Sequence, residues 1–542
     1  MKKTLICLLS IILLLSTLPP FTASAATGTP ISSADEFMAM KSGGEYYLTA
    51  DITLGATYDQ PFEGVLNGNG KSITISSPIF SDFSGKVENL TINGEIKATD
   101  RDSSAFALTS SKGFEAVKCT NNVSVTVTGN AKYVSGFVGL CYNAAVKFTD
   151  CVNNGNISLD YTADEKARVG GFGSVIDTLI MSGCVNNGNV FLKGNTCIAG
   201  GFVARVALNK GENYLEISRS ENNGNVTVED TYINKGGSDA GGLIGHIGTS
   251  GNIGVYKFRG CRNNGKIDAP YRVGGFVGYC YGSTHNAYVD MQFCINTGDV
   301  SYGRMKSEND YTVYHDYASA FVAYTNTDYT TIKYCIDTGK VILREGALTY
   351  DKDSKFIGLS SSNIEEYDIK GIYLVNKDQY KYFSWNSPEL SVLNTLKIEE
   401  WEGVIATTPD DLALGRVAYE INLAAASDET GTSAFSEGYA FYQKLGEDAL
   451  PSVDESRGWV VLSGDTYQNG DRPIETEPET ETETVTTSVE TTIVTTQDTT
   501  EPEETTQPVQ SGCGGFSCYA VLSVIICASF ILKKWSVVKK MR

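Results

Sequence analysis

The stretches "CVNNGNI" (Cys151–Ile157) and "CVNNGNV" (Cys184–Val190) are nearly identical and start 33 residues apart. Related heptapeptides begin at Cys119, Ser220, Cys261, Cys294 and Cys335. A second phrase, of the type "GGFVGYC" (Gly274–Cys280), precedes every copy except the first. Since the two phrases keep one order at a period of about 33 residues, they indicate a structural repeat and not a single chemical site.

The repeat unit is built from short β-type runs bounded by Gly or Asn-Gly, and it sustains no helical period. Without a helix to carry the chain back, consecutive strands must turn corners and stack on the previous coil. Coils about 4.8 Å apart pair each strand with its copies above and below. We therefore predict an all-β fold, a parallel β-helix.

The heptapeptide is interpreted as a corner of this solenoid. Its Asn-Gly step supplies residues that tolerate the positive φ of a tight turn, its asparagines can hydrogen-bond to their copies, and its cysteine packs inward. The predicted corner ladder comprises Cys151, Asn154, Gly155, Cys184, Asn187, Gly188, Cys261, Asn264 and Gly265.

In the second phrase a glycine lets the backbone pass closely, and the next residue points inward in a stacked apolar column. These pairs are Gly171-Phe172, Gly201-Phe202, Gly242-Leu243 and Gly275-Phe276.

The cysteines of the repeat allow three interpretations. A zinc site needs CxxC-like spacing or a convergent Cys/His cluster, but the repeat has no such spacing and His246, His285 and His315 are isolated. Stacked cysteines can also approach disulfide distance. Because Ser220 interrupts the column, buried free thiols are favoured, and we predict no metal and no cofactor.

Both ends of the chain carry membrane-related signals. Residues 1–25 have two lysines, an apolar core and the small-residue step Ala23-Ser24-Ala25, which is typical of a signal peptide. Residues 471–512, rich in Thr, Glu and Pro, read as a disordered stalk. Residues 513–542 contain the apolar run Phe516–Leu532 followed by a basic tail, which predicts a transmembrane anchor.

The formal net charge of −21 argues against nucleic-acid binding, since phosphate neutralisation needs clustered Lys and Arg. The stalk alone contributes about ten carboxylates, so the charge does not define a binding face.

The two phrases resemble those of bacterial surface proteins with GLUG-type repeats. The resemblance implies a right-handed parallel β-helix displayed on a cell surface, with 26–100 as N-terminal cap and first coils and 101–345 as the repeats. Residues 346–470 then provide the last coils and a small α+β cap region, and a short N-terminal helix closes the other end.

The sequence itself predicts a helix near 409–426 in this cap region. Thr408 can cap it, Pro409 suits its first turn, and an apolar face recurs at helical spacing. That face comprises Leu414, Val417, Ala418 and Ile421. We expect the helix to cover the end of the solenoid, because an uncovered end would pair with other chains.

We recognise no catalytic motif, because the available carboxylates lie in different units and no GxSxG or HExxH occurs. Eleven tyrosines fall between Tyr271 and Tyr334, and an insertion within 301–317 interrupts the repeat. Since insertions in repeats often form the binding face, Tyr302, Tyr311 and Tyr314 are the candidate binding residues.

We therefore expect an adhesin-like surface protein that is exported, anchored in the cell membrane by its C-terminal segment, and binds an extracellular glycan or a host or matrix protein. Two alternatives stay open: a polysaccharide hydrolase or lyase on the same scaffold, and a structural envelope spacer.

Overall fold

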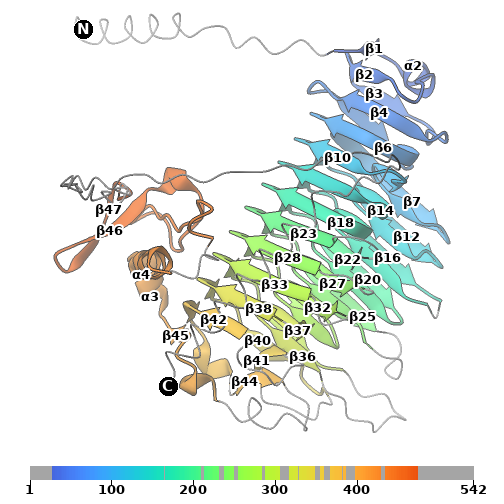
Figure 1. The fold of residues 1–542 in the computed structure, drawn as a ribbon. Coiled ribbons are helices and arrows are strands. Elements are labelled where there is room, and N and C mark those ends of the chain that lie inside the picture. Colours follow the sequence, from blue (N-terminus) through green and yellow to red (C-terminus); the bar gives the residue numbers. More distant parts are fainter. Residues whose placement is uncertain are drawn as a thin grey trace, which may run out of the picture. The chain divides into compact units, whose positions relative to one another are not determined.

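The computed structural model describes residues 27–473, apart from 164, 209–212, 231–236, 250–253, 283–286, 305–315, 328, 348–354, 359–366, 381, 386–396 and 429–433. Contacts divide the chain after Pro473, so the described residues all belong to the first of two units. Short strands stack in parallel coil after coil (Figure 1), which confirms the predicted parallel β-solenoid. The handedness of its coil stays a prediction.

Two successive coils illustrate the arrangement. The first contains β15 (Val152–Asn153), β16 (Ile157–Tyr161), β17 (Ala167–Gly170) and β18 (Gly173–Ser182). The second contains β19 (Val185–Asn186), β20 (Val190–Gly194), β21 (Cys197–Gly200), β22 (Val203–Leu208) and β23 (Asn213–Ser218). Each strand pairs in parallel with its copy, so the sequence period is the length of one coil.

The solenoid has four faces, which we number in chain order from the cysteine. Face 1 contains β11 (Thr120–Asn121), β15, β19, β24 (Glu221–Asn222), β29 (Arg262–Asn263), β34 (Ile295–Asn296), β39 (Ile336–Asp337) and β43 (Ile372–Leu374). Face 2 contains β12 (Ser124–Gly129), β16, β20, β25 (Val226–Asp230), β30 (Ile267–Asp268), β35 (Val300–Tyr302) and β40 (Val341–Leu343).

Face 3 is a separate seven-stranded sheet: β8 (Ser103–Ser104), β13 (Tyr133–Ser135), β17, β21, β26 (Asp239–Gly241), β31 (Arg272–Gly274) and β36 (Tyr317–Ser319). Face 4 begins with β9 (Ala107–Thr109), β14 (Val138–Thr149), β18, β22, β27 (Ile244–Thr249), β32 (Val277–Gly282) and β37 (Val322–Asn326). It continues with β23, β28 (Gly254–Arg259), β33 (Ala287–Gln292) and β38 (Tyr329–Lys333).

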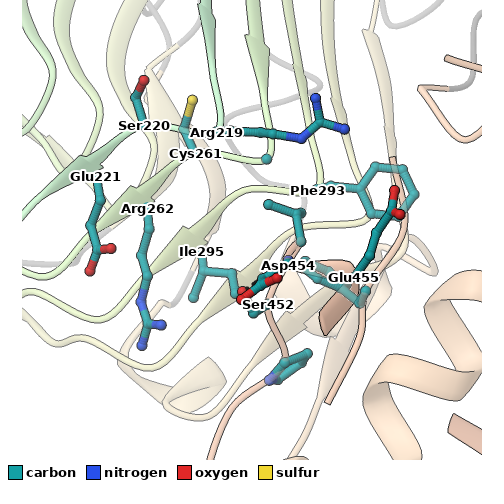
Figure 2. Close-up of a pocket in the computed structure, with 14 residues that line it drawn as sticks. Arg219, Ser220, Glu221, Cys261, Arg262, Phe293, Ile295, Ser452, Asp454 and Glu455 are labelled. Atoms are coloured by element: carbon teal, nitrogen blue, oxygen red, sulfur yellow. Dashed lines mark hydrogen bonds between the residues drawn. The ribbon is translucent and has the colours of Figure 1, made fainter. Parts of the chain in front are cut away.

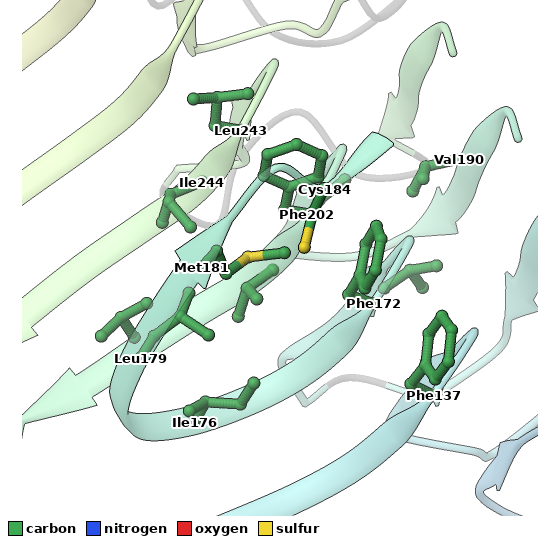
Figure 3. Close-up of a cluster of buried hydrophobic side chains, with 14 of the residues drawn as sticks. Phe137, Phe172, Ile176, Leu179, Met181, Cys184, Val190, Phe202, Leu243 and Ile244 are labelled. Carbon is green, nitrogen blue, oxygen red and sulfur yellow. The ribbon is translucent and has the colours of Figure 1, made fainter. Parts of the chain in front are cut away.

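The interior of the coils is apolar and holds the predicted column of the second phrase. Figure 3 shows Phe137, Phe172 and Phe202 beside Cys184, all fully buried. The rings of Phe137 and Phe172 stack at 5.1 Å between centroids. A Cβ on Gly171 would lie 2.1 Å from a backbone oxygen of the next coil, so the expected close approach of the backbone is confirmed. The nine cysteines in the described part of the chain are buried and form no disulfide with one another, as favoured from the sequence.

Two asparagine ladders run along the corner, where the sequence suggested one. In the inner ladder, side-chain amides donate to the carbonyl oxygen of the copy in the next coil, with N–O distances of 2.7–2.9 Å. It comprises Asn121, Asn153, Asn186, Asn222, Asn263, Asn296 and finally Asp337, all buried. The second asparagines of the repeat form an outer, exposed ladder that donates in the opposite direction, through Asn93, Asn122, Asn154, Asn187, Asn223 and Asn264.

The expectation of positive φ at the Asn-Gly step is wrong. Along the repeats, the left-handed position is the residue just before the cysteine, such as Asp150 (φ 52°) and Gly183 (φ 65°). The glycine of the corner is needed for another reason. A Cβ on Gly188 would lie 1.9 Å from the backbone oxygen of Gly155, because stacked corners approach each other more closely than a side chain allows.

The N-terminal end is closed by α2 (Ala34–Met38), which Ser33 caps and whose Phe37 is fully buried. The C-terminal helix begins after Thr408 with a capping box to Asp411, as its sequence predicts. It is not continuous, however, because Gly415 (φ 84°) divides it into α3 (Pro409–Ala413) and α4 (Arg416–Ala426).

The position of these helices also differs from the expectation. With β46 (Trp459–Ser463) and β47 (Thr466–Gly470) they form a C-terminal module that packs on the side of the coils, not over their end (Figure 1). Val417, Ala418 and Ile421 are buried there, whereas Leu414 is 63% exposed. The solenoid side of this contact comprises Phe293, Ile295, Tyr334, Ile336 and Tyr373. Apolar outward positions on the late coils of face 1 therefore decide where the module sits.

No helix within the described ranges is long and apolar enough to cross a membrane. The predicted signal peptide (1–25), the stalk from residue 474 and the anchor (513–542) lie outside those ranges.

A candidate binding groove

Faces 3 and 4 meet at a re-entrant corner. Side chains that point outward from two sheets diverge at a convex corner, but here they touch. The Cζ atom of Arg272 on β31 lies 3.5 Å from the ring centroid of Tyr279 on β32. One coil later, the ring centroids of Tyr317 and Tyr324 are 4.8 Å apart. The backbone turns sharply at this corner, because a Cβ on Gly274 would lie 2.0 Å from the backbone oxygen of Val277.

We call this corner the groove and define it by two columns of outward residues in register. On face 3 the column is Tyr133, Arg168, Ile198, Asp239, Arg272 and Tyr317. On face 4 it is Leu140, Val175, Arg205, His246, Tyr279 and Tyr324. The groove therefore runs along the solenoid axis and receives two side chains from each coil.

The late end of the groove is aromatic. Tyr279 lies between Tyr281 and Tyr324, with centroid distances of 6.0 and 5.5 Å. Tyr271 packs against Tyr317 at 5.9 Å. Burial raises the pKa of Tyr279 and of Tyr317, so both stay neutral phenols that can stack on a ligand and hydrogen-bond to it.

The middle of the groove holds an acid and a histidine in the same coil. The Oδ2 of Asp239 lies 2.8 Å from Nδ1 of His246, and its Oδ1 accepts from Nε of Arg272 at 2.5 Å. Burial alone would raise the pKa of Asp239, but Arg272 and His246 outweigh it and lower the pKa. Burial lowers the pKa of His246 although Asp239 opposes this. The imidazole is therefore neutral at pH 7, and its bond to Asp239 assigns the proton to Nδ1 and the lone pair to Nε2.

Of the three predicted binding residues, only Tyr302 lies within the described part of the chain. Tyr302, on β35, is 1% exposed, because its side chain packs inward from face 2 into the core. It therefore cannot contact a ligand at the surface. Tyr311 and Tyr314 lie outside the described residues. The two residues that flank their segment, Arg304 and Asp316, form an ion pair at 3.2 Å. The predicted corner residues lie on face 1 and at its turn, not in the groove.

Sequence reasoning missed the groove although its residues stand at fixed offsets from the second phrase. Arg272 precedes Gly274 by two positions and Tyr279 follows it by five, and the other coils repeat these offsets. The residue types vary from coil to coil, so they do not stand out as a repeat. The signal was the tyrosine-rich stretch itself, of which the structure gathers Tyr271, Tyr279, Tyr281, Tyr317 and Tyr324.

Apart from the groove, a cavity of about 510 Å³, here called the second cavity, lies between face 1 and the C-terminal module. Figure 2 shows Glu221 and Arg262 on the solenoid wall and Ser452, Asp454 and Glu455 on the module wall. Arg262 donates to Asn264 at 2.8 Å, and Asp454 accepts from the backbone of Ser456 at 3.0 Å. Arg262 and Asp454 thus already have partners within the protein, which favours an interface between the solenoid and the module over a ligand site. Within the described ranges, no cluster of three or more His, Cys, Asp or Glu side chains could hold a metal ion.

Among known proteins, no family model and no curated protein matches the chain. Among solved structures, a Bacteroides ovatus protein described as a "putative immunoglobulin A1 protease" aligns with 59% of this chain and 85% of its own. The two are 15% identical, with a TM-score of 0.30. A TM-score this low assigns no function to the chain.

Proposed function

We propose that this protein is a cell-surface β-solenoid that binds an extended extracellular glycan in the groove. The observation that carries the proposal is the pair of outward columns, rich in tyrosine and arginine, that run in register along six coils and touch each other in the three late coils. Export through residues 1–25, anchoring through 513–542, right-handed coiling and kinship with GLUG-type surface proteins belong to the same proposal.

The chemistry of the groove suits a sugar polymer. Aromatic rings pack on the apolar faces of sugars, while phenol and guanidinium groups donate hydrogen bonds to their hydroxyls. Because the groove follows the axis, successive sugars meet successive coils. Face 4 adds a flat aromatic platform: Tyr288 and Tyr329 stack at 5.0 Å, inclined by 4°, and are 37% and 47% exposed.

A glycan array probed with the full-length protein tests the proposal. We expect binding to at least one polysaccharide, and Tyr281→Ala combined with Tyr324→Ala should weaken it about tenfold through lost stacking. Tyr47→Ala, at a half-exposed tyrosine of β2 (Glu45–Leu48) remote from the groove in sequence, is the matched control. Absence of glycan binding, or binding that both variants leave unchanged, would contradict the proposal once thermal midpoints show that the variants fold.

Catalysis in the same groove is a second candidate function, favoured by the Asp239–His246 pair. In a lyase reaction on a uronate polymer, Nε2 of His246 would accept the proton next to the carboxyl group. That electron pair would form the new carbon–carbon double bond, and the glycosidic oxygen would leave with a proton from a neighbouring phenol such as Tyr279. Release of unsaturated sugar ends by the wild type and not by His246→Gln would support an enzyme; binding without cleavage supports the adhesin. If neither binding nor cleavage is observed, the structural envelope spacer is the remaining alternative.

A further inference from the structure

The early half of the groove differs from the late half in its charge. Arg168, on face 3, and Arg205, on face 4 of the next coil, both point into it. Burial is the main cause that lowers the pKa of Arg205, and the positive charge of Arg168 lowers this pKa further, so the two guanidinium groups are close. Like charges repel, so the arrangement needs an anion between or beside them to be favourable.

The carboxylate of Asp177 is near enough to raise the pKa of Arg205, but within the described part of the chain neither arginine forms a hydrogen bond or ion pair with a carboxylate. The Nε–H groups of Arg168 and Arg205 are buried and have no hydrogen-bond acceptor there, and Arg168 donates instead from Nη1 to the backbone oxygen of Lys166 at 3.3 Å. Two other arginines pair with carboxylates: Arg272 with Asp239, and Arg304 with Asp316. A buried guanidinium N–H without an acceptor is costly, and a bound acid group would remove that cost.

The surroundings add positive charge and an aromatic wall. The Cζ atom of Arg168 lies 5.5 Å from the ring centroid of Tyr133, and Tyr142 is 40% exposed. A cavity of about 430 Å³ opens beside Arg168 and Tyr133, and its lining is completed by Lys132, Glu165, Lys166 and Thr196, without Arg205 or Tyr142. Three of these residues are cationic and one is anionic, in a protein whose formal net charge is −21. The cavity therefore stands out from the rest of the chain electrostatically.

We infer that Arg168 and Arg205 form a subsite for the carboxylate or sulfate groups of an acidic polysaccharide. This inference rests on the proposed glycan-binding function and names its substrate class. Guanidinium groups bind both oxyanions through paired N–H donors, and Tyr133 offers a face for the sugar ring. Two arginines on neighbouring coils suit a polymer that carries acid groups along its length.

Binding of three soluble polymers to the full-length protein tests the subsite: polygalacturonate for carboxylates, dextran sulfate for sulfates and dextran as the neutral probe. The wild type should bind one or both acidic polymers at least tenfold more tightly than dextran, and added salt should weaken that binding. Arg168→Gln with Arg205→Gln should lower the affinity at least tenfold. The matched control, Arg219→Gln with Arg262→Gln in the second cavity, should stay within about twofold of wild type.

The outcomes separate the subsite from the broader proposal. Tighter binding of dextran, or acidic binding that the groove variant leaves unchanged, overturns the subsite while the glycan-binding groove stands. If no polymer binds and the glycan array is also blank, both fail. Tighter binding of a sulfated peptide than of either acidic polymer would overturn the polysaccharide assignment. Should the double variant unfold, the salt dependence of the wild type and the single variant Arg205→Lys, which keeps the charge, still decide the question.

Discussion

Replacing Asn186 with alanine should destabilise the solenoid far more than the same change at its neighbour Asn187. The side chain of Asn186 is fully buried. It donates to Asn222 at 2.8 Å and to the Gly188 oxygen at 2.9 Å, and it accepts from Asn153 at 2.7 Å. Alanine removes all three bonds and leaves buried groups of the adjacent coils without partners, each of which costs about 1–3 kcal/mol.

We therefore expect Asn186→Ala to lower the free energy of unfolding by about 4 kcal/mol. Asn187 makes the same kind of ladder bonds, to Asn154 at 2.8 Å and from Asn223 at 2.9 Å, but on the exposed side of the corner. Water can replace these bonds, so Asn187→Ala should cost less than about 1 kcal/mol.

Urea unfolding followed by circular dichroism, with unchanged m-values, measures the difference between the two variants. Equal losses would refute the reasoning, since they would mean that burial of the inner ladder adds nothing to its hydrogen bonds.

Three further changes test other parts of the fold. Burial raises the pKa of Asp337 from 3.8 to about 7, so between these pH values the folded protein keeps a proton that the unfolded chain releases. The free energy of unfolding should therefore fall by up to about 4 kcal/mol between pH 4 and 7. In Asp337→Asn, the urea midpoint should lose this part of its pH dependence. Gly188→Ala should prevent regular stacking, because its Cβ would meet the Gly155 oxygen, whereas Gly55→Ala, with open space around it, should be nearly neutral in thermal melts. Thr408→Ala should lower stability by about 1 kcal/mol in urea titrations of the C-terminal module, and no loss would contradict the capping role.

The sequence predicted the repeating architecture well because the packing contacts of a solenoid recur once per coil, so the residues that make them recur at the same period in the sequence. Each coil must present the same shape to the next, so Gly171 and Phe172 recur wherever the same contact recurs. The Asn-Gly corner was located correctly, but the cause of its glycine was not, since the approach of Gly188 to Gly155 is a contact between coils and not a property of one turn.

The candidate site could be predicted only in part. The tyrosine-rich stretch pointed to the right coils, yet Tyr302 faces the core while Tyr279 and Tyr324 face the groove. Which side of a strand a residue takes follows from the register of its coil, and an irregular repeat obscures that register. The position of the C-terminal module was missed for a similar reason, because Ile295 and Ile336 form an apolar surface only after their coils are stacked.

The sequence by itself determined the coil: its length, its inward column and one asparagine ladder, all of which depend on contacts that repeat between neighbouring units. Only the tertiary structure decided that faces 3 and 4 meet at a re-entrant corner, where Arg168 approaches Arg205 and Asp239 meets His246. Arg168 and Arg205 come from different coils, and Asp239 and His246 come from two adjacent faces of one coil. Their meeting depends on the bend between two sheets, which no period in the sequence records.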